Sequence, residues 1–430
     1  MEANSENDPS GLLKDRTQDD AWATALNPCD LGSISTHINI IGDLGTQLAN
    51  GEDQVRLGLL KSARNLVRAL ETPRETMIRH CWAEPSAFIA IEIGIKIGLF
   101  RALSLGGDSK KASDLAQKLN VDPALVGRIL RHLAAMGYIT ETGADEYKPT
   151  QFSSALNIRV IGDGYPLITE CVRPAVDQFP KFLERTNYIV PTSATNSPYQ
   201  YAHNTKLNML EHLEIDPINF QRFHNHMGGY RQGRDSWMDT GFFPVHQRLA
   251  KGAESHPDAV FLVDVGGSLG HDLEEFCRKH PDVPGRLILQ DLPSVLDQIQ
   301  HLDERIERIA YDFYTEQPVK GSRAYFIHSV LHDWPDDICH RILARIREAM
   351  KPGYSKLLVY ENVIPATGAD WQATAEDLMV MITSSSLERS EDSWRALLEG
   401  AGFNVNGIWR TDNALESLIE CELDISRLEI

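Results

Sequence analysis

Hydrophobic residues follow two different spacings along the chain. From about Asp30 to Leu105, apolar positions recur every three or four residues, which predicts amphipathic helices. The segment "PSAFIAIEIGIKIGLFRAL" is apolar around most of a helix, so we expect one helix over 86–103, buried on several sides. From about Pro257, short apolar runs alternate with helical patterns. This alternation predicts a doubly wound α/β fold with a parallel sheet, in which ligands bind beyond the carboxyl ends of the strands.

The second half predicts a strand in each of five apolar runs: "AVFLVDVGG", "RLILQDLP", "IERIAYDFY", "RAYFIHSVL" and "SKLLVYENVIP". A helical pattern follows each of them except "IERIAYDFY". A closing strand pair, "VNGIWRT" and "ALESLIECEL", follows the last helix. Between the two halves, 160–255 reads as helices joined by loops. Phe223 and Met227 lie there in an aromatic and Met-rich helix, either as core residues or as the lining of a substrate pocket.

Residues 109–156 combine two short helices, a turn at "NVD" and two strands around "TGADE", the pattern of a winged helix-turn-helix. That motif suggests DNA binding, but 109–150 holds six basic and five acidic residues and so lacks a basic surface. A structural or dimerisation role is the better interpretation, because a fold alone does not define a function.

The whole chain of 430 residues carries a formal net charge of −19, which disfavours partners such as nucleic acid or an anionic membrane. Its six cysteines are scattered without a C-x-x-C pair, so we expect neither a metal site nor a disulfide framework, and a reducing, cytoplasmic location. The acidic N-terminus lacks the apolar segment of a signal peptide. The longest apolar stretch, 87–100, is too short to span a membrane.

The turn "VDVGGSLGH" follows the first predicted strand of the sheet and opens a helix. Gly266 and Gly267 allow a tight turn and a close approach to a ligand, and Asp264 brings a carboxylate to the strand end. Asp291, after the second strand, suits a ribose diol. The turn has neither a G-x-G-x-x-G spacing nor a cation for a pyrophosphate, so a cationic sulfonium with a ribose and a base fits better than NAD.

The stretch "AYFIHSVLHDWPDD" places His328 and His332 at the end of the fourth strand. Taken alone, His332 is equally well explained as a general base or as a histidine that caps the next helix. A histidine suits the base role, because its ordinary pKa lies near neutrality.

Together, "VDVGGSLG", "DLP", "HDWPDD", "ENVIP" and "LERSEDSWRALLEGAGF" resemble the class I, S-adenosylmethionine-dependent O-methyltransferases of the caffeate/flavonoid type, in particular their fungal secondary-metabolism branch. The likeness extends from about 75 to 412. The turn departs from the plant pattern "GGGTG", because Ser268 and Leu269 remove one glycine. The family often has Lys or Arg at the position of His328, which leaves the role of that residue open.

The resemblance implies a role for each matching position, with S-adenosyl-L-methionine as the cofactor. His332 would be the catalytic base, flanked by Glu361 and Glu388. The cofactor would contact residues of the strand ends: Asp264, Gly266, Gly267, Asp291, Leu292, Asp312, Phe313 and His328. Asp312 and Phe313 would hold its adenine. The substrate, an aromatic or polyketide-like small molecule, would contact Phe223, Met227, Trp334 and Met381.

The family is typically dimeric through its N-terminal helices, so the resemblance also implies a homodimer. We therefore divide the chain into a disordered tail (1–30), a helical and winged-helix dimerisation domain (31–160), and a helical substrate-lining segment with a Rossmann-like catalytic domain (161–430). Methylation of a phenol or enol hydroxyl is the expected reaction. Some fungal relatives instead keep the cofactor bound and catalyse pericyclic or dehydrative reactions; the retained His332 favours methyl transfer.

Overall fold

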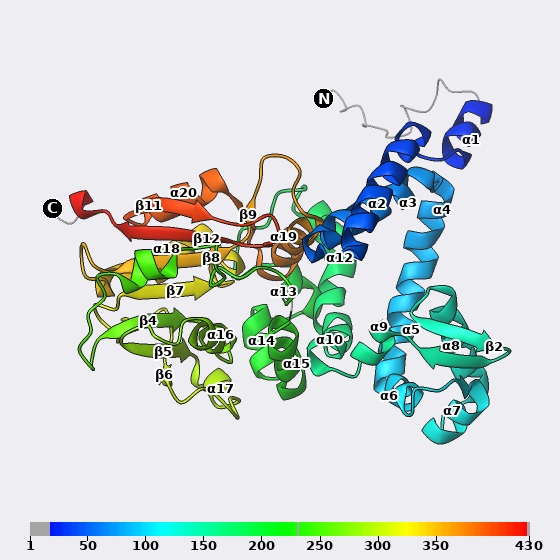
Figure 1. The fold of residues 1–430 in the computed structure, drawn as a ribbon, viewed down its shortest axis with the longest axis horizontal. Helices are drawn as coiled ribbons and strands as arrows, with labels where there is room; N and C mark the ends of the chain where they lie inside the picture. Colours follow the sequence, from blue (N-terminus) through cyan, green and yellow to red (C-terminus); the bar gives the residue numbers. More distant parts are fainter. Residues whose placement is uncertain (1–17, 230–231, 428–430) are drawn as a thin grey trace, which may run out of the picture. The chain divides into compact units, whose positions relative to one another are not determined.

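The computed structural model describes residues 18–229 and 232–427 (Figure 1). The chain divides into two compact units between Asn157 and Ile158. Of the tail over 1–30 that we expected to be disordered, 1–17 lies outside the described residues, whereas Gln18–Leu26 form a helix, α1. All six cysteines are free thiols. No helix in the described part of the chain is long and apolar enough to cross a membrane.

The first unit is mainly helical. Its helices, after α1, are η2 (Leu31–Ser33), α2 (Ile34–Ala49), η3 (Asp53–Val55), α3 (Arg56–Leu70), α4 (Pro73–Ile78), η4 (Arg79–Ala83), α5 (Glu84–Lys96), α6 (Leu99–Ser104), α7 (Ala112–Leu119), α8 (Pro123–Ala135) and α9 (Gln151–Ala155). The strands β1 (Lys110–Lys111), β2 (Ile139–Gly143) and β3 (Glu146–Pro149) form an antiparallel sheet in the order β1-β3-β2. The two helices and the strand pair expected within 109–156 are thus present.

The single helix that we expected over 86–103 is wrong, because the chain breaks there into α5 and α6. Gly98 lies between the two helices with a φ of +74°, a left-handed conformation that favours glycine. The apolar character that the sequence showed is nevertheless buried, since Leu99, Phe100 and Leu103 are each at most 2% exposed.

The second unit begins with short helices that precede the sheet. These are α10 (Arg159–Gly162), α11 (Gly164–Leu167), η5 (Ile168–Val172), α12 (Arg173–Arg185), α13 (Pro198–His203), α14 (Met209–Glu214), α15 (Pro217–Met227) and η6 (His246–Ala250). The alternating strands and helices follow from Val260, as the hydrophobic pattern predicts.

The sheet of this unit has seven strands in the order β11-β12-β8-β7-β4-β5-β6. They are β4 (Val260–Val265), β5 (Arg286–Asp291), β6 (Ile306–Ala310), β7 (Ala324–His328), β8 (Lys356–Glu361), β11 (Phe403–Trp409) and β12 (Ser417–Leu423). The first five pair in parallel, and β12 and β11 add an antiparallel edge. This is the doubly wound α/β fold that we expected.

The helices α16 (His271–Lys279), α17 (Pro293–Leu296), α18 (Asp336–Ala349), α19 (Trp371–Ser384) and α20 (Glu391–Gly400) follow the strands, together with the 3-10 turns η7 (Leu331–Asp333) and η8 (Ile425–Arg427) and a short parallel pair, β9 (Val363–Ile364) and β10 (Arg389–Ser390). The two faces of the sheet bury separate cores. Along β7, Tyr325 and Ile327 join one core and Phe326 joins the other, as alternation on a strand requires.

Candidate active site

The turn after β4 is held against the neighbouring strand β5. The backbone N–H groups of Gly266 and Gly267 donate to the carbonyl oxygen of Gln290, at 2.8 and 3.1 Å. Gly266 has a φ of +77°, and a Cβ at Gly267 would collide with the buried carboxylate of Asp264. Both positions therefore require glycine, which leaves a bare backbone surface at the strand end.

Asp291 ends β5 and organises the same turn. Its two carboxylate oxygens accept the backbone N–H groups of Ser268 (2.8 Å) and Leu292 (2.7 Å). Burial raises the pKa of Asp291, and these hydrogen bonds oppose that shift. Each oxygen keeps a further lone pair for a ligand hydroxyl. The carboxylates of Asp291 and Asp264, together with the glycine backbone, fit a cationic ligand that carries a ribose.

The end of β6 presents Asp312 and an aromatic cluster. Asp312 accepts the backbone N–H of Tyr314 at 2.9 Å. The rings of Phe313, Tyr314 and Trp334 pack edge to face, with centroids 5.0 to 6.1 Å apart. Trp334, which we expected to contact the substrate, therefore lies beside Phe313, which we expected to contact the adenine.

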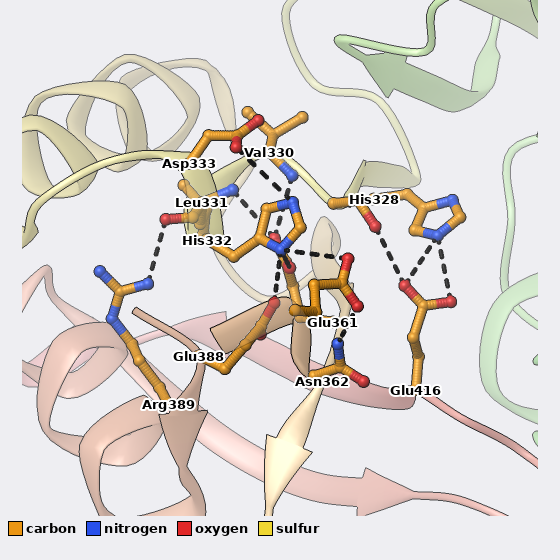
Figure 2. A network of polar contacts seen from close by, with 12 residues as sticks. His328, Val330, Leu331, His332, Asp333, Glu361, Asn362, Glu388, Arg389 and Glu416 are labelled. Atoms are coloured by element: carbon orange, nitrogen blue, oxygen red, sulfur yellow. Dashed lines mark hydrogen bonds and ion pairs between the residues drawn. The ribbon is translucent and has the colours of Figure 1, made fainter. Parts of the chain in front are cut away.

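His332 lies in η7, just beyond β7, and its side chain is buried (Figure 2). Its Nδ1 is 2.7 Å from Oε1 of Glu388 and 3.8 Å from Oε2 of Glu361. The structure thus brings together the three residues that the motifs single out. Because the Glu388 carboxylate can only accept, Nδ1 carries a proton and the lone pair of the neutral ring lies on Nε2. Within the described residues Nε2 has no hydrogen-bond partner, and Oδ1 of Asp333 lies 4.0 Å away.

Each glutamate is held in place by hydrogen bonds that involve the backbone. Glu361, at the end of β8, accepts the N–H groups of Val330 (3.1 Å) and Leu331 (2.9 Å), which fixes the segment that carries His332. The backbone N–H of Glu388 donates to Asp377 of α19 at 2.9 Å. The histidine and its partners are therefore held by three separate elements of the fold.

Glu376 of α19 is a site residue that the motifs did not reveal. Its Oε1 lies 4.0 Å from Nδ1 of His332, and its carboxylate accepts from Asn362 at 2.9 Å. Burial, with smaller effects from neighbouring charges, raises its pKa to about 7. The helical spacing could have identified it, because Glu376 falls between the buried Ala373 and Val380 on one face of a correctly predicted helix.

Arg389 is a second residue that the motifs passed over. Its buried guanidinium donates to the carbonyl oxygens of Leu331 (3.0 Å) and Trp334 (2.9 Å) and to Asp336 (2.7 Å). It therefore holds the polypeptide on both sides of His332.

The charges around His332 set its chemistry. Burial opposes protonation of the ring, but the carboxylates of Glu361, Asp333 and Glu388 outweigh it and raise the pKa of His332 well above its usual value. For Glu361 burial acts in the other direction and raises the pKa of its carboxyl group to about 7, although the charge of His332 lowers it. The cluster therefore stabilises the imidazolium that forms when the ring accepts a proton.

The ring nitrogens of His328 contact carboxylates and not the turn between β4 and α16 (266–270), which is called the cofactor turn below. Its Nδ1 lies 2.6 Å from Asp272 of α16, and its Nε2 lies 3.0 and 3.2 Å from the two oxygens of Glu416. Neither carboxylate belongs to a motif. An acid near the start of a helix, such as Asp272, is usually explained by the helix dipole.

The residues expected to contact substrate are only partly brought together. Phe223 and Met227 both lie on α15, where Phe223 packs against an apolar cluster and Met227 is 37% exposed. Met381 is on α19, the helix of Glu376. On α15, Nδ1 of His224 lies 3.0 Å from Oγ of Ser268, so this helix is bonded to the cofactor turn.

A metal ion is a further chemical option for the central cluster. Ligand atoms of His332, Glu361 and Glu388 lie within 4.8 Å of one another. Glu361 already accepts two backbone hydrogen bonds and Glu388 contacts Nδ1 of His332, so each side chain has a partner within the protein without an ion. The absence of a metal, which we expected from the sequence, stays a prediction.

Comparison with known proteins assigns the class. The family model for the O-methyltransferase domain matches residues 257–404. A solved structure of LepI in complex with S-adenosylmethionine superposes with a TM-score of 0.82 at 29% identity, covering 90% of this chain and 99% of that one. OxaC in complex with S-adenosylhomocysteine and oxaline gives a TM-score of 0.80 at 27% identity, covering 91% and 99%. The fold is that of an S-adenosyl-L-methionine-dependent methyltransferase.

The curated relatives define the family. O-methyltransferase mfmE of Annulohypoxylon moriforme is 35% identical over 388 residues, 90% of this chain and 95% of that protein. O-methyltransferase mpaG of Penicillium roqueforti (strain FM164) is 35% identical over 395 residues, 91% of this chain and 99% of that protein. The chain belongs to the O-methyltransferase family, with S-adenosyl-L-methionine as its cofactor, and both of these relatives are fungal proteins.

Proposed function

We propose that the enzyme methylates a phenol or enol hydroxyl of an aromatic or polyketide-like secondary metabolite, with His332 as the general base. The observation that carries the proposal is the 2.7 Å contact between Nδ1 of His332 and Glu388, because it directs the lone pair of the neutral ring to Nε2. A base in that state accepts the hydroxyl proton of the substrate.

The cofactor, when bound, supplies a methyl group on a cationic sulfur as the electrophile. The glycine backbone at Gly266 and Gly267 and the carboxylate of Asp291 would hold it, and Asp264 adds negative charge beneath the turn. Asp312 and Phe313 would hold its adenine. Positioning of the hydroxyl oxygen supplies much of the rate of such an in-line displacement.

The remaining steps belong to the side chains of this chain. Nε2 of His332 takes the proton from the substrate hydroxyl as the oxygen becomes nucleophilic. Glu388 keeps the ring oriented and Glu361 holds the backbone of Val330 and Leu331, so that neither ring nor segment shifts when the charge forms. The nearby carboxylates stabilise the imidazolium until the product leaves.

A second candidate reaction is a pericyclic or dehydrative conversion with the cofactor bound but not consumed. A solved structure described as a pericyclic reaction enzyme has a TM-score of 0.82 with this chain at 28% identity, covering 90% of this chain and 100% of that one. The His332–Glu388 pair favours methyl transfer, because a proton acceptor for a hydroxyl is what O-methylation requires.

Product analysis separates the two reactions. The purified enzyme is incubated with an isotopically methyl-labelled donor and a panel of phenols and enols, and products are read by mass spectrometry. O-methylation predicts a product that has gained the labelled methyl group, with one S-adenosylhomocysteine released per product. A product that is isomerised or dehydrated beside an intact donor contradicts it.

A homodimer is part of the proposal. In the first unit α2 has no buried residue, and large apolar side chains of this helical region are exposed, among them Ile38 at 53%, Val67 at 52% and Trp82 at 67%. A second copy of the chain would remove such a surface from water. Sedimentation of wild type and of Ile38→Glu tests this: a wild-type monomer at micromolar concentration contradicts it.

A further inference from the structure

His328, the last residue of β7, lies between two carboxylates from other parts of the chain, with its side chain only 9% exposed. Asp272 is the second residue of α16, directly after the cofactor turn, and Glu416 directly precedes β12. The 2.6 Å contact to Asp272 uses Nδ1. The contacts at 3.0 and 3.2 Å to Glu416 use Nε2 (Figure 2). Oγ of Ser329 also donates to Glu416, at 3.0 Å.

This geometry requires a protonated ring. A carboxylate accepts hydrogen bonds, so two carboxylates on two ring nitrogens need an N–H on each nitrogen, and only the imidazolium has both. Burial opposes that charge, but the charges and hydrogen bonds of Asp272 and Glu416 outweigh it and raise the pKa of His328 to about 10. A neutral ring has only one N–H, so it could donate to only one of these two carboxylates.

His328, Asp272 and Glu416 lie where the cofactor turn meets the segment that carries His332. A Cβ at Gly266 would lie 2.9 Å from Cγ2 of Val330, so the turn and this segment are in direct contact. Val330 stands midway between His328 and His332 in the chain. Asp272 ties one side of that contact to His328, and Glu416 ties His328 and Ser329 to the antiparallel edge of the sheet.

We propose that His328 is a positioning residue whose positive charge clamps Asp272 and Glu416 together and so holds the cofactor turn in register with His332. It differs from the direct cofactor contact that the family resemblance implies. The inference rests on the proposed function for the role of His332, but its readout is cofactor binding, which does not depend on methyl transfer.

Glu416→Gln tests the charge of the clamp. With one of the two carboxylates replaced by a neutral amide, the imidazolium is less stabilised, and His328 should lose its proton at lower pH, within about pH 6 to 9. We expect the dissociation constant of S-adenosylhomocysteine, measured by calorimetry, to rise on the order of tenfold across that range in Glu416→Gln, because the neutral ring keeps at most an uncharged hydrogen bond to Asp272 and holds the start of α16 more weakly. In wild type it should change by less than about twofold below pH 9.

Two controls identify the titrating group. Glu361 and Tyr360 also face His328, and Glu361 has a pKa near the same range. In the double variant His328→Lys with Glu416→Gln the cation is permanent, so the pH dependence should disappear; if it persists, it belongs to another group. Glu420→Gln is the matched control, because Glu420 is an equally buried carboxylate of β12 that pairs with Arg248 and Lys356 instead of a histidine. It should lower stability without any pH-dependent binding.

The outcomes are distinct. A flat binding profile in Glu416→Gln, or the same profile in Glu420→Gln, overturns the clamp. If Glu416→Gln shows the pH dependence but no substrate is ever methylated, the clamp stands and the proposed reaction fails. If wild type methylates a substrate but Glu416→Gln binds S-adenosylhomocysteine equally well at every pH, the proposed reaction stands and the clamp fails.

Discussion

Two buried histidines four residues apart, His332 and His328, have similar surroundings and different chemistry. Both are held by glutamates from other elements of the fold. His332 makes one short contact, at Nδ1, whereas both nitrogens of His328 lie within hydrogen-bond distance of carboxylates. On the roles proposed above, the number of ring nitrogens that contact a carboxylate, more than burial or charge, distinguishes the base from the structural cation. The predictions below test that difference.

The largest expected effect is on turnover. His332→Ala should lower kcat on the order of 10²–10⁴-fold, because the substrate proton loses its acceptor. Its affinity for S-adenosylhomocysteine should stay within about twofold of wild type, since the cofactor turn is unchanged. Steady-state kinetics and calorimetry on the same preparation measure both, and an active His332→Ala would disprove the base assignment.

The second effect is on stability. His328→Asn should lower the free energy of unfolding by about 3–5 kcal/mol, because it removes a buried cation from between two carboxylates. His332→Asn should cost less, since Glu361 readily takes up a proton in its place. Urea denaturation of the two variants compares them directly, and a larger loss in His332→Asn would reverse the contrast.

The third effect is a shift in the pH–rate profile. A raised pKa of His332 means that kcat/KM rises with pH above the usual range of histidine, as the ring loses its proton. Glu361→Gln removes a negative charge beside the ring, so the rise should move to lower pH. An unchanged profile in Glu361→Gln would show that another group titrates.

The fourth effect is a slope of stability with pH. Because the pKa of His328 is about 10 in the folded state and near 6.5 when unfolded, the folded protein binds more protons between these values. Its contribution to stability is therefore complete below pH 6.5 and is lost as pH rises toward 10. Denaturant titrations should show this decline in wild type and a shallower one in His328→Gln.

The smallest expected effect is that of a chelator. If His332, Glu361 and Glu388 act through protons alone, prolonged treatment with EDTA should leave turnover unchanged within error. Loss of activity that added divalent cation restores would instead assign an ion to the cluster, whose ligand atoms are close enough to hold one.

Much of the fold follows from local patterns. The alternation of short apolar runs and helices predicts the strands of the sheet, and the motifs predict that His332, Glu361 and Glu388 meet. Gly98 shows a limit, because a continuous apolar pattern does not reveal one left-handed residue that breaks a helix.

Long-range partners are the other limit. Asp272 and Glu416 are 144 positions apart and meet only because α16 and β12 both reach His328. A sequence shows that such acids exist, but not that the sheet order β12-β8-β7-β4 brings them to one histidine. The helical pattern could have placed Glu376 on the buried face of its helix, but only the structure shows its carboxylate beside His332.

Transfer of label in a single turnover tests the central claim most directly. Excess enzyme is mixed with a methyl-labelled donor and a substrate found in the product screen, for wild type and for His332→Gln. The account predicts that wild type moves the label to the substrate oxygen, while His332→Gln binds the donor and transfers the label at least about a hundredfold more slowly. Product formed without loss of label from the donor, or equal rates in the two proteins, would contradict it.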